Sequence, residues 1–309
     1  MSAVGEAKGA VPELTRSGVR SQSTIGRPVE FRGLSLFHGY DATVRILPAA
    51  ENTGIVFRRV DLSGAPDIPA RCEFVTRVPR RTVLAASNEA TVETVEHLMA
   101  ALAGLQVDNC LIEINAPEVP AYDGSCRPFC DGILDAGLVQ TTAAASVVTV
   151  SSACRLKGQA RQSLALRPYL LPCPAITYHF DYGVRGLIPA QQFSIELSPE
   201  TFYQQISNAR TFVLESEIAA LKKMGYGSHL TTRDIVVIGS DGPIDNSLRW
   251  SDEGVRHKIL DCVGDLALSG TAFHGHLTAT RSGHHLNHEM ANVLTMMKQG
   301  QPAAAITAA

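Results

Sequence analysis

The segment WSDEGVRHKILDCVGDLALSG, late in the chain, limits the possible folds most, because it predicts a helix without an ordinary water-facing side. With about 3.6 residues per turn, its apolar residues gather on one side of the helix. His257, Asp261 and Asp265 follow one another at i, i+4 steps on the other side. A solvated polar face is the simpler interpretation of this row. Against it, Leu260 and Leu268 flank the row, and a free surface rarely carries leucines on both margins of such groups.

The titratable row contains residue types that bind metals. Side chains at i and i+4 of a helix are neighbours, so His257 and Asp261 can share one metal ion. A metal hydrolase also needs a third ligand, an open coordination position, and a carboxylate that takes the proton from water without binding the metal. These further groups have to come from other parts of the chain.

A second helix, predicted over residues 91–105, carries another titratable pair. Its apolar residues recur at i, i+3, i+4 and i+7, and Thr91 is the expected N-cap. His97 lies opposite this apolar stripe, and Glu96 comes directly before it. A solvated helix face explains the pair simply. The alternative is that Glu96, rotated by about 100° from His97, is the base of a metal hydrolase.

The segment TRSGHHLNHEM offers a third group. His284 follows a predicted strand and a Ser-Gly turn, where a side chain can be held rigidly. A protonated imidazole there could stabilise an oxyanion or protonate a leaving amine, and a nearby carboxylate would raise its pKa. Asp265, one turn past Asp261, has the right type for this partner. We expect His285 and His288 at the surface.

Both halves of the chain order their elements alike, which predicts two α+β units of similar build. Strands are predicted at ATVRILPA, GIVFRRV, NCLIEI, SVVTV, AITYHFD, FSIEL, DIVVIG and FHGHLTATR, and further helices at CRPFCDGILDAGL, 199–209, 213–224 and from about Leu286. We expect the α+β class with two domains of similar topology, each a β-sheet layer, and helices packed between the domains.

The expected bounds are a disordered tail at 1–22, an N-terminal domain at 23–142 with Glu96 and His97, a C-terminal domain at 146–299 with His257, Asp261 and His284, and a tail at 300–309. The stretch VQTTAAAS is the expected linker.

Composition excludes several classes of partner. A net charge of −3 and no Lys/Arg run argue against nucleic acid. No apolar run reaches the roughly 20 residues that span a bilayer, so we expect no stable membrane insertion. The seven cysteines are an odd, scattered set, which favours a reducing cytoplasm, and Cys126 with Cys130 is better explained by helix packing than by a zinc ribbon. We expect a monomer with a small-molecule substrate.

Taken together, four motifs resemble one family. TVEHLMAALAGLQVDNCLIEINAPEVPAYDGSCRPF, SNARTF, VRHKILDCVGDLALSG and SGHHLN are similar, in order and spacing, to the zinc-dependent UDP-3-O-acyl-N-acetylglucosamine deacetylases of lipid A biosynthesis. The resemblance runs from about residue 22 to residue 293. It implies a zinc amidohydrolase that releases acetate from an acylated UDP-amino sugar.

The resemblance also implies roles for individual residues. Zn²⁺ would be held by His97, His257 and Asp261, and Glu96 would be the general base on the zinc-bound water. His284 would stabilise the oxyanion and protonate the leaving amine, with Asp265 orienting and charging it. The remaining implied contacts are Thr211 to the oxyanion, Lys258 to the diphosphate and Phe212 to the sugar or uridine. The acyl groove is expected around an insert within PYLLPCPAITYHFDYGVRGLIPAQQ.

The chain departs from the family pattern at two places. GLSLFHG puts Phe37 where the family has a histidine, and His38 comes one place later. GYGSHLTTRD puts His229, Arg233 and Asp234 where the family has a Gly-Gly-Ser run and small or apolar residues. Either the substrate differs in its sugar, nucleotide or acyl part, or the chain is a divergent copy. Because the residues of the zinc chemistry are complete, the expected difference concerns the identity of the substrate.

Two alternative functions follow from these departures. One is deacetylation of a different nucleotide-linked or acylated amino sugar. The other is a catalytically silent zinc protein that binds a UDP-sugar or regulates the pathway. The presence of Glu96 and His284 argues against the silent protein, because neither is needed merely to hold zinc.

Overall fold

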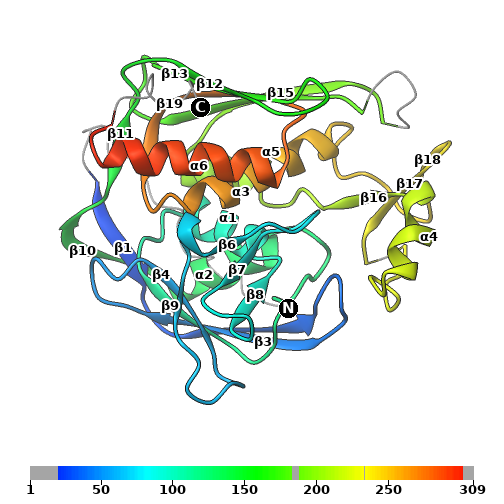
Figure 1. Cartoon of the computed structure of the whole chain (residues 1–309), viewed down its shortest axis with the longest axis horizontal. Helices are drawn as coiled ribbons and strands as arrows, with labels where there is room; N and C mark the ends of the chain where they lie inside the picture. Colours follow the sequence, from blue (N-terminus) through cyan, green and yellow to red (C-terminus); the bar gives the residue numbers. More distant parts are fainter. Residues whose placement is uncertain (1–19, 183–187, 233, 302–309) are drawn as a thin grey trace, which may run out of the picture.

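A computed structural model describes residues 20–182, 188–232 and 234–301. Two main sheets form its outer layers, and helices lie between them (Figure 1). The helices are α1 Glu96–Gly104, α2 Arg127–Ala136, α3 Pro199–Gln205, α4 Glu215–Lys223, α5 Glu253–Ala267 and α6 His284–Lys298. The expected tail at 1–22 falls mostly outside the described residues, as does nearly all of the tail at 300–309, but β1 (Ser21–Ile25) already belongs to the fold.

The two main sheets share one topology. The first, in the order β2-β3-β9-β4-β5, contains β2 Val29–Leu34, β3 Asp41–Pro48, β9 Cys110–Ile114, β4 Ile55–Arg59 and β5 Ile68–Pro69. The second, in the order β12-β13-β19-β14-β15, contains β12 Cys154–Lys157, β13 Ser163–Arg167, β19 Ala272–Thr280, β14 Pro174–Phe180 and β15 Gln191–Glu196, and β11 Val147–Thr149 also pairs with β19. In each sheet the pair formed by the third and fourth strands is parallel and the other pairs along this order are antiparallel. The expected α+β class with two similar units is confirmed.

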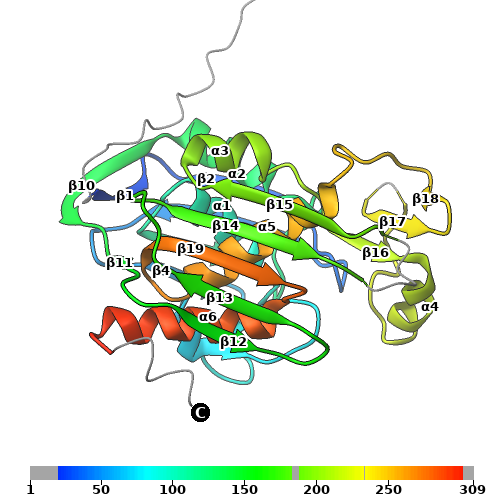
Figure 2. The ribbon, with the colours of Figure 1, turned by 90° about the horizontal axis from the view of Figure 1, so that it is seen from above.

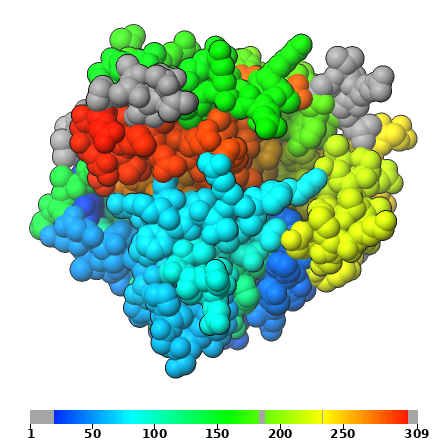
Figure 3. Space-filling model, viewed as in Figure 1, coloured from blue at the N-terminus to red at the C-terminus, as the bar shows by residue number. Residues whose placement is uncertain are grey.

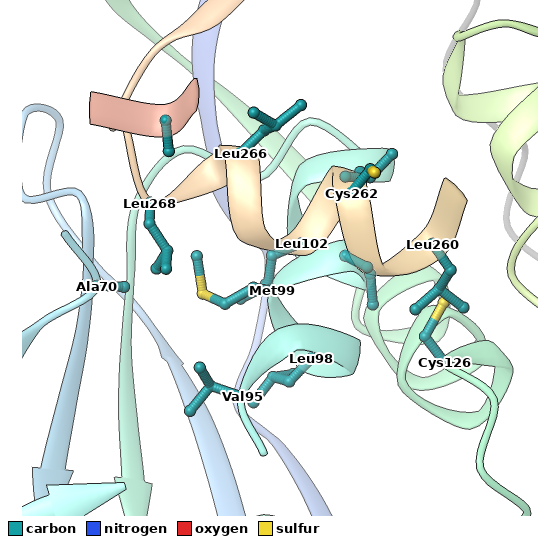
Figure 4. Packing of buried hydrophobic residues seen from close by; sticks show 14 of the residues in the cluster. Ala70, Val95, Leu98, Met99, Leu102, Cys126, Leu260, Cys262, Leu266 and Leu268 are labelled. Atoms are coloured by element: carbon teal, nitrogen blue, oxygen red, sulfur yellow. The ribbon is translucent and has the colours of Figure 1, made fainter. Parts of the chain in front are cut away.

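Helices α1 and α5 pack against each other at the centre of the molecule, and Met99 of α1 lies between their ribbons (Figure 4). Gly264 of α5 permits this close approach, because a Cβ at this position would lie 2.0 Å from the carbonyl oxygen of Glu96. The contact sets the spacing between the two helices that carry the predicted metal ligands.

Gly264→Ala is therefore expected to destabilise the protein by about 1–3 kcal/mol, the usual cost of overpacking, because backbone atoms must move apart. Urea unfolding measures the loss. Gly33→Ala is the matched control, since its added Cβ would meet Pro120 at an ordinary 3.5 Å. Equal stability of the two variants would contradict this account of the α1–α5 contact.

Two local expectations were wrong. The helix at 91–105 begins only at Glu96, because residues Thr91–Glu93 form β8, which pairs with β7 (Val83–Ala85), so Thr91 is not its N-cap. The supposed linker VQTTAAAS lies largely in β10 (Leu138–Ala144), which pairs with β1. In both cases pairing with another strand decided the conformation of a stretch that has little local preference; that strand is close in sequence for β8 and distant for β10.

A smaller excursion projects from one end of the molecule (Figures 1 and 2). It contains α4 and a three-stranded sheet of β16 Phe212–Leu214, β17 Val236–Gly239 and β18 Gly242–Pro243. Its atoms lie against those of the first half of the chain (Figure 3), and an ion pair of 2.6 Å joins Arg80 Nη2 to Glu217 Oε1 there. The remaining short elements are η1 Cys72–Phe74 and β6 Val75–Thr76, the latter paired with β7.

Within the described residues, no helix has both the length and the apolar character needed to cross a membrane.

Candidate active site

A cavity of about 840 Å³ lies where the two units and the excursion meet. Glu96 and His97 reach it from α1, His257 and Asp261 from α5, and His284 from the start of α6. These are the titratable groups that the sequence singled out. The central packing of α1 on α5 brings them together from both halves of the chain.

His97, His257 and Asp261 form the one group of potential metal ligands found among the described residues. One ligand atom from each lies within 4.8 Å of the others. His97 Nε2 is 3.8 Å from Asp261 Oδ1, and His257 Nε2 is 3.3 Å from the same oxygen. All three side chains are buried, which excludes the solvated faces considered for both helices.

Asp261 Oδ1 provides a test of whether the group fits a metal. Among the described residues it is the one buried side-chain oxygen or nitrogen without a hydrogen-bond partner. Such an atom is costly to bury unless something else satisfies it. The other Asp261 oxygen, Oδ2, accepts from Lys258 Nζ at 2.9 Å, and His257 Nδ1 lies 3.1 Å from the Ala209 carbonyl oxygen, which leaves Nε2 free to bind. The donor set therefore fits a divalent cation.

The protonation states suit metal binding as well. Burial and the neighbouring His257 lower the pKa of His97 to about 3, and burial also lowers the pKa of His257. Burial alone would raise the pKa of Asp261, but Lys258 and His257 more than offset it and lower that pKa well below its ordinary value. Two neutral imidazoles and one carboxylate are the forms that coordinate a metal.

Glu96 lies beside the potential ligands without belonging to their group. It is 3 % exposed, its Oε2 accepts from the Thr82 backbone N–H at 3.0 Å, and burial raises the pKa of its carboxyl to about 7. A carboxylate that titrates near neutral pH can both take up and release a proton, as a general base requires.

His284 faces Glu96 across the cavity, with 3.9 Å between His284 Nε2 and Glu96 Oε1. Its Nδ1 lies 2.9 Å from Asp265 Oδ2, and Asp265 is fully buried. Burial alone would lower the pKa of His284, but the charge and hydrogen bond of Asp265 outweigh burial and raise it to about 10. The structure therefore places an imidazole with a raised pKa opposite the Glu96 carboxylate.

Thr211, Phe212 and Lys258 also line the cavity. The Thr211 backbone N–H donates to the Gly124 carbonyl at 2.9 Å, which fixes the position of this residue. The Lys258 ammonium lies 5.9 Å from the centroid of the Phe212 ring. All of the sequence-predicted site residues except Asp265 thus line one cavity, and Asp265 lies behind His284, 2.9 Å from its Nδ1.

A model of the UDP-3-O-acyl N-acetylglycosamine deacetylase family matches residues 22–296 of the chain. The chain belongs to this family. A protein of Geobacter sp. (strain M21) and one of Citrifermentans bemidjiense, both named UDP-3-O-acyl-N-acetylglucosamine deacetylase, are each 38% identical to it over 277 residues. The matched region covers 88% of this chain and 88% of each relative.

In this member of the deacetylase family, the two departures from the family pattern lie close together. Phe37 and Tyr226 pack edge to face, and the Arg81 guanidinium lies 4.5 Å from the centroid of the Phe37 ring. His229 Nε2 lies 2.9 Å from the carbonyl oxygen of Ser35. The segment GYGSHLTTRD therefore contacts the segment that contains Phe37. Arg233 lies outside the described residues. Phe37 and Tyr226, one from each departure, line the cavity.

The acyl groove was expected around an insert within residues 168–192. That stretch instead contains β14 of the second sheet, although its Tyr178, Phe180 and Tyr182 do line the cavity. Residues 183–187 of the stretch lie outside the described residues. The other apolar wall is formed by the excursion, through Ile218, Leu221, Tyr226, Leu230, Ile235 and Val237.

Sequence reasoning missed three buried residues near the site. His288 is 8 % exposed, so its expected place at the surface was wrong, whereas His285 is exposed as expected. Arg210 donates through Nε to Glu253 Oε1 at 2.8 Å, and both side chains are buried. This ion pair joins the residue before Thr211 to the first turn of α5. For these three residues the sequence did carry a signal, because each lies within one helical turn of a predicted site residue.

Proposed function

We propose that this deacetylase hydrolyses the acetamide of a UDP-3-O-(3-hydroxyacyl)-N-acetylglucosamine and releases acetate, the committed step of lipid A biosynthesis. The observation that carries the proposal is the pairing of a buried carboxylate with a cationic imidazole, Glu96 and His284, beside three metal-binding side chains. Amide hydrolysis needs both a base for water and an acid for the leaving amine.

His97, His257 and Asp261 would hold Zn²⁺, since two imidazoles and one carboxylate are a common catalytic zinc set that leaves a position open. When bound, zinc supplies Lewis acidity and lowers the pKa of water to about 7. Holding a metal also explains why the chain buries Asp261 Oδ1 without a hydrogen-bond partner.

The protein's own groups would move the protons. Glu96 takes a proton from the attacking water, and the oxygen of that water stays with the acetyl carbon. The C–N bond then breaks, and the amine nitrogen receives a proton from His284 Nε2, whose Nδ1 side is held by Asp265. Thr211 would hold the oxyanion that forms during attack.

The rest of the cavity is suited to an acylated nucleotide sugar. Lys258 would meet the diphosphate, and Phe212 would stack on the sugar or uridine. The apolar residues of β14 and the excursion would cover the acyl chain. The enzyme would act as a cytoplasmic monomer.

One observation favours a second substrate. Phe37 and Tyr226 add aromatic bulk to the cavity wall, and His229 adds an imidazole beside it. A related acylated or nucleotide-linked amino sugar with a different shape would fit such a wall.

An acetate-release assay with zinc-loaded protein tests the proposal. We expect turnover of the acylated UDP-N-acetylglucosamine, and much slower turnover of the same compound without its acyl chain, because apolar burial contributes about 0.8 kcal/mol per CH₂. Failure to release acetate from either compound would refute the proposed activity.

Asp265→Asn is expected to move the alkaline limb of the pH–rate profile to lower pH. In the native protein, Asp265 raises the pKa of His284 to about 10 from an ordinary 6.5, so the acid stays protonated until the pH rises through that range. Without the charge of Asp265, burial lowers this pKa, and the protonated form is lost at lower pH. The profile of kcat against pH measures the shift; an unmoved alkaline limb would remove His284 from the role of acid.

A further inference from the structure

Asp265 has more partners than orienting His284 requires. Its Oδ2 accepts from His284 Nδ1 at 2.9 Å and from Asn287 Nδ2 at 2.8 Å. Its Oδ1 accepts from Thr82 Oγ1 at 2.6 Å, and His288 Nε2 lies 3.3 Å from the same oxygen. The carboxylate is fully buried and is therefore held at both oxygens. Partners on both sides fix its orientation, and with it the orientation of His284.

Thr82 is the residue that touches both halves of the proton-transfer machinery. Its backbone N–H donates to Glu96 Oε2 at 3.0 Å, while its hydroxyl donates to Asp265. It is fully buried and is not among the described residues that line the cavity. Thr82 can therefore influence the reaction only through the side chains that it contacts. These are Glu96 and Asp265, together with His284 and His288, whose ring nitrogens lie 3.5 Å and 3.0 Å from its hydroxyl.

The direction of the hydrogen bonds gives His288 a role as well. A hydroxyl has one proton, and the Thr82 hydroxyl donates it to Asp265. A proton on His288 Nε2, which lies 3.0 Å from Thr82 Oγ1 and 3.3 Å from Asp265 Oδ1, is then donated toward these two oxygens. His288 thus holds the Thr82 hydroxyl in the rotamer that serves Asp265.

We propose that Thr82, oriented by His288, is a positioning residue that couples the base Glu96 to the acid pair Asp265–His284. Thr82 belongs to the first half of the chain, whereas Asp265, His284 and His288 belong to the second. The coupling therefore fixes the position of Glu96, in the first half, relative to Asp265 and His284, in the second half. The roles of base and acid rest on the proposed function; the contacts do not.

Thr82→Val tests the coupling, because it removes the hydroxyl and keeps both the side-chain shape and the backbone N–H to Glu96. We expect kcat to fall on the order of tenfold or more, as for a lost hydrogen bond to a charged group, with KM and metal content unchanged. Thr82→Ser should restore most of kcat. In an Asp265→Asn background, Thr82→Val should cause no further loss, since both changes act through one carboxylate.

Thr295→Val of α6 is the matched control, because its hydroxyl bonds the backbone carbonyls of Ser269 and Ala291. A loss for Thr82→Val that adds fully to that of Asp265→Asn, or that Thr295→Val reproduces, would overturn the proposal. If Thr82→Val does not fold, His288→Leu replaces it in the comparison with Asp265→Asn. The loss of kcat in the double variant should again be smaller than the sum of the two single losses.

A readout without substrate separates this inference from the proposed function. In protein with ¹⁵N-labelled histidine, the Nδ1 proton that His284 shares with Asp265 should resonate downfield. We expect Thr82→Val to shift this resonance and Thr295→Val to leave it in place. A resonance unmoved by Thr82→Val would refute the positioning role, even in a protein that releases acetate. If Thr82→Val shifts the resonance as expected but the wild-type protein releases no acetate, only the proposed function is refuted.

Discussion

Replacing Glu96 with alanine is expected to lower kcat by on the order of a hundredfold or more while bound zinc stays stoichiometric. The carboxylate is buried beside the potential metal ligands but outside their group, and it faces His284 Nε2 at 3.9 Å. Removing it takes away the proposed base, and the three potential metal ligands remain. Steady-state acetate release together with metal analysis measures both quantities.

Glu200→Ala is the control for this change, because Glu200 is exposed in the first turn of α3. It should retain full activity and metal. Near-normal turnover of the Glu96 variant would remove Glu96 from the role of base. Loss of its metal would instead show that Glu96 helps to hold the ion.

Replacing His257 with alanine should abolish both metal binding and activity. His257 is 2 % exposed, its Nε2 approaches Asp261 Oδ1, and Ala209 fixes its other nitrogen. Loss of one ligand from a three-residue set leaves two protein ligands, too few for a catalytic zinc site. Metal content after dialysis, measured by elemental analysis, tests the assignment directly.

His276→Ala is the matched histidine control. His276 is half-buried on β19, where Nε2 lies 2.9 Å from Thr177 Oγ1, and it does not line the cavity. We expect this variant to keep its zinc. A His257 variant that still carries stoichiometric zinc would show the ligand assignment to be wrong.

The sequence singled out His257 and Asp261 as potential metal ligands because the pair is local. His257 and Asp261 are one turn apart on α5, and helix geometry alone makes them neighbours. The alternation of buried and half-buried residues in β9 likewise follows from the strand period, so this strand was predicted nearly to the residue. The family resemblance then supplied the partners that local geometry could not.

Local patterns failed where a distant segment decided the outcome. VQTTAAAS resembles a linker, but pairing with β1 makes most of it a strand. His288 looked like a surface residue beside the exposed His285, yet α6 turns it toward Asp265. Phe37 and Tyr226 pack against each other although they are far apart in the chain. No periodic pattern in the sequence predicts such a contact.

By itself the sequence determined the chemistry of each helix: which face carries acids and histidines, and at what spacing. The tertiary structure alone decided which of these groups meet. Thr82 and Asp265 are 183 positions apart, and only the packing of the two halves brings the hydroxyl within 2.6 Å of the carboxylate. Helical and strand periods encode neighbours a few residues apart, whereas contacts across a core depend on how whole faces pack.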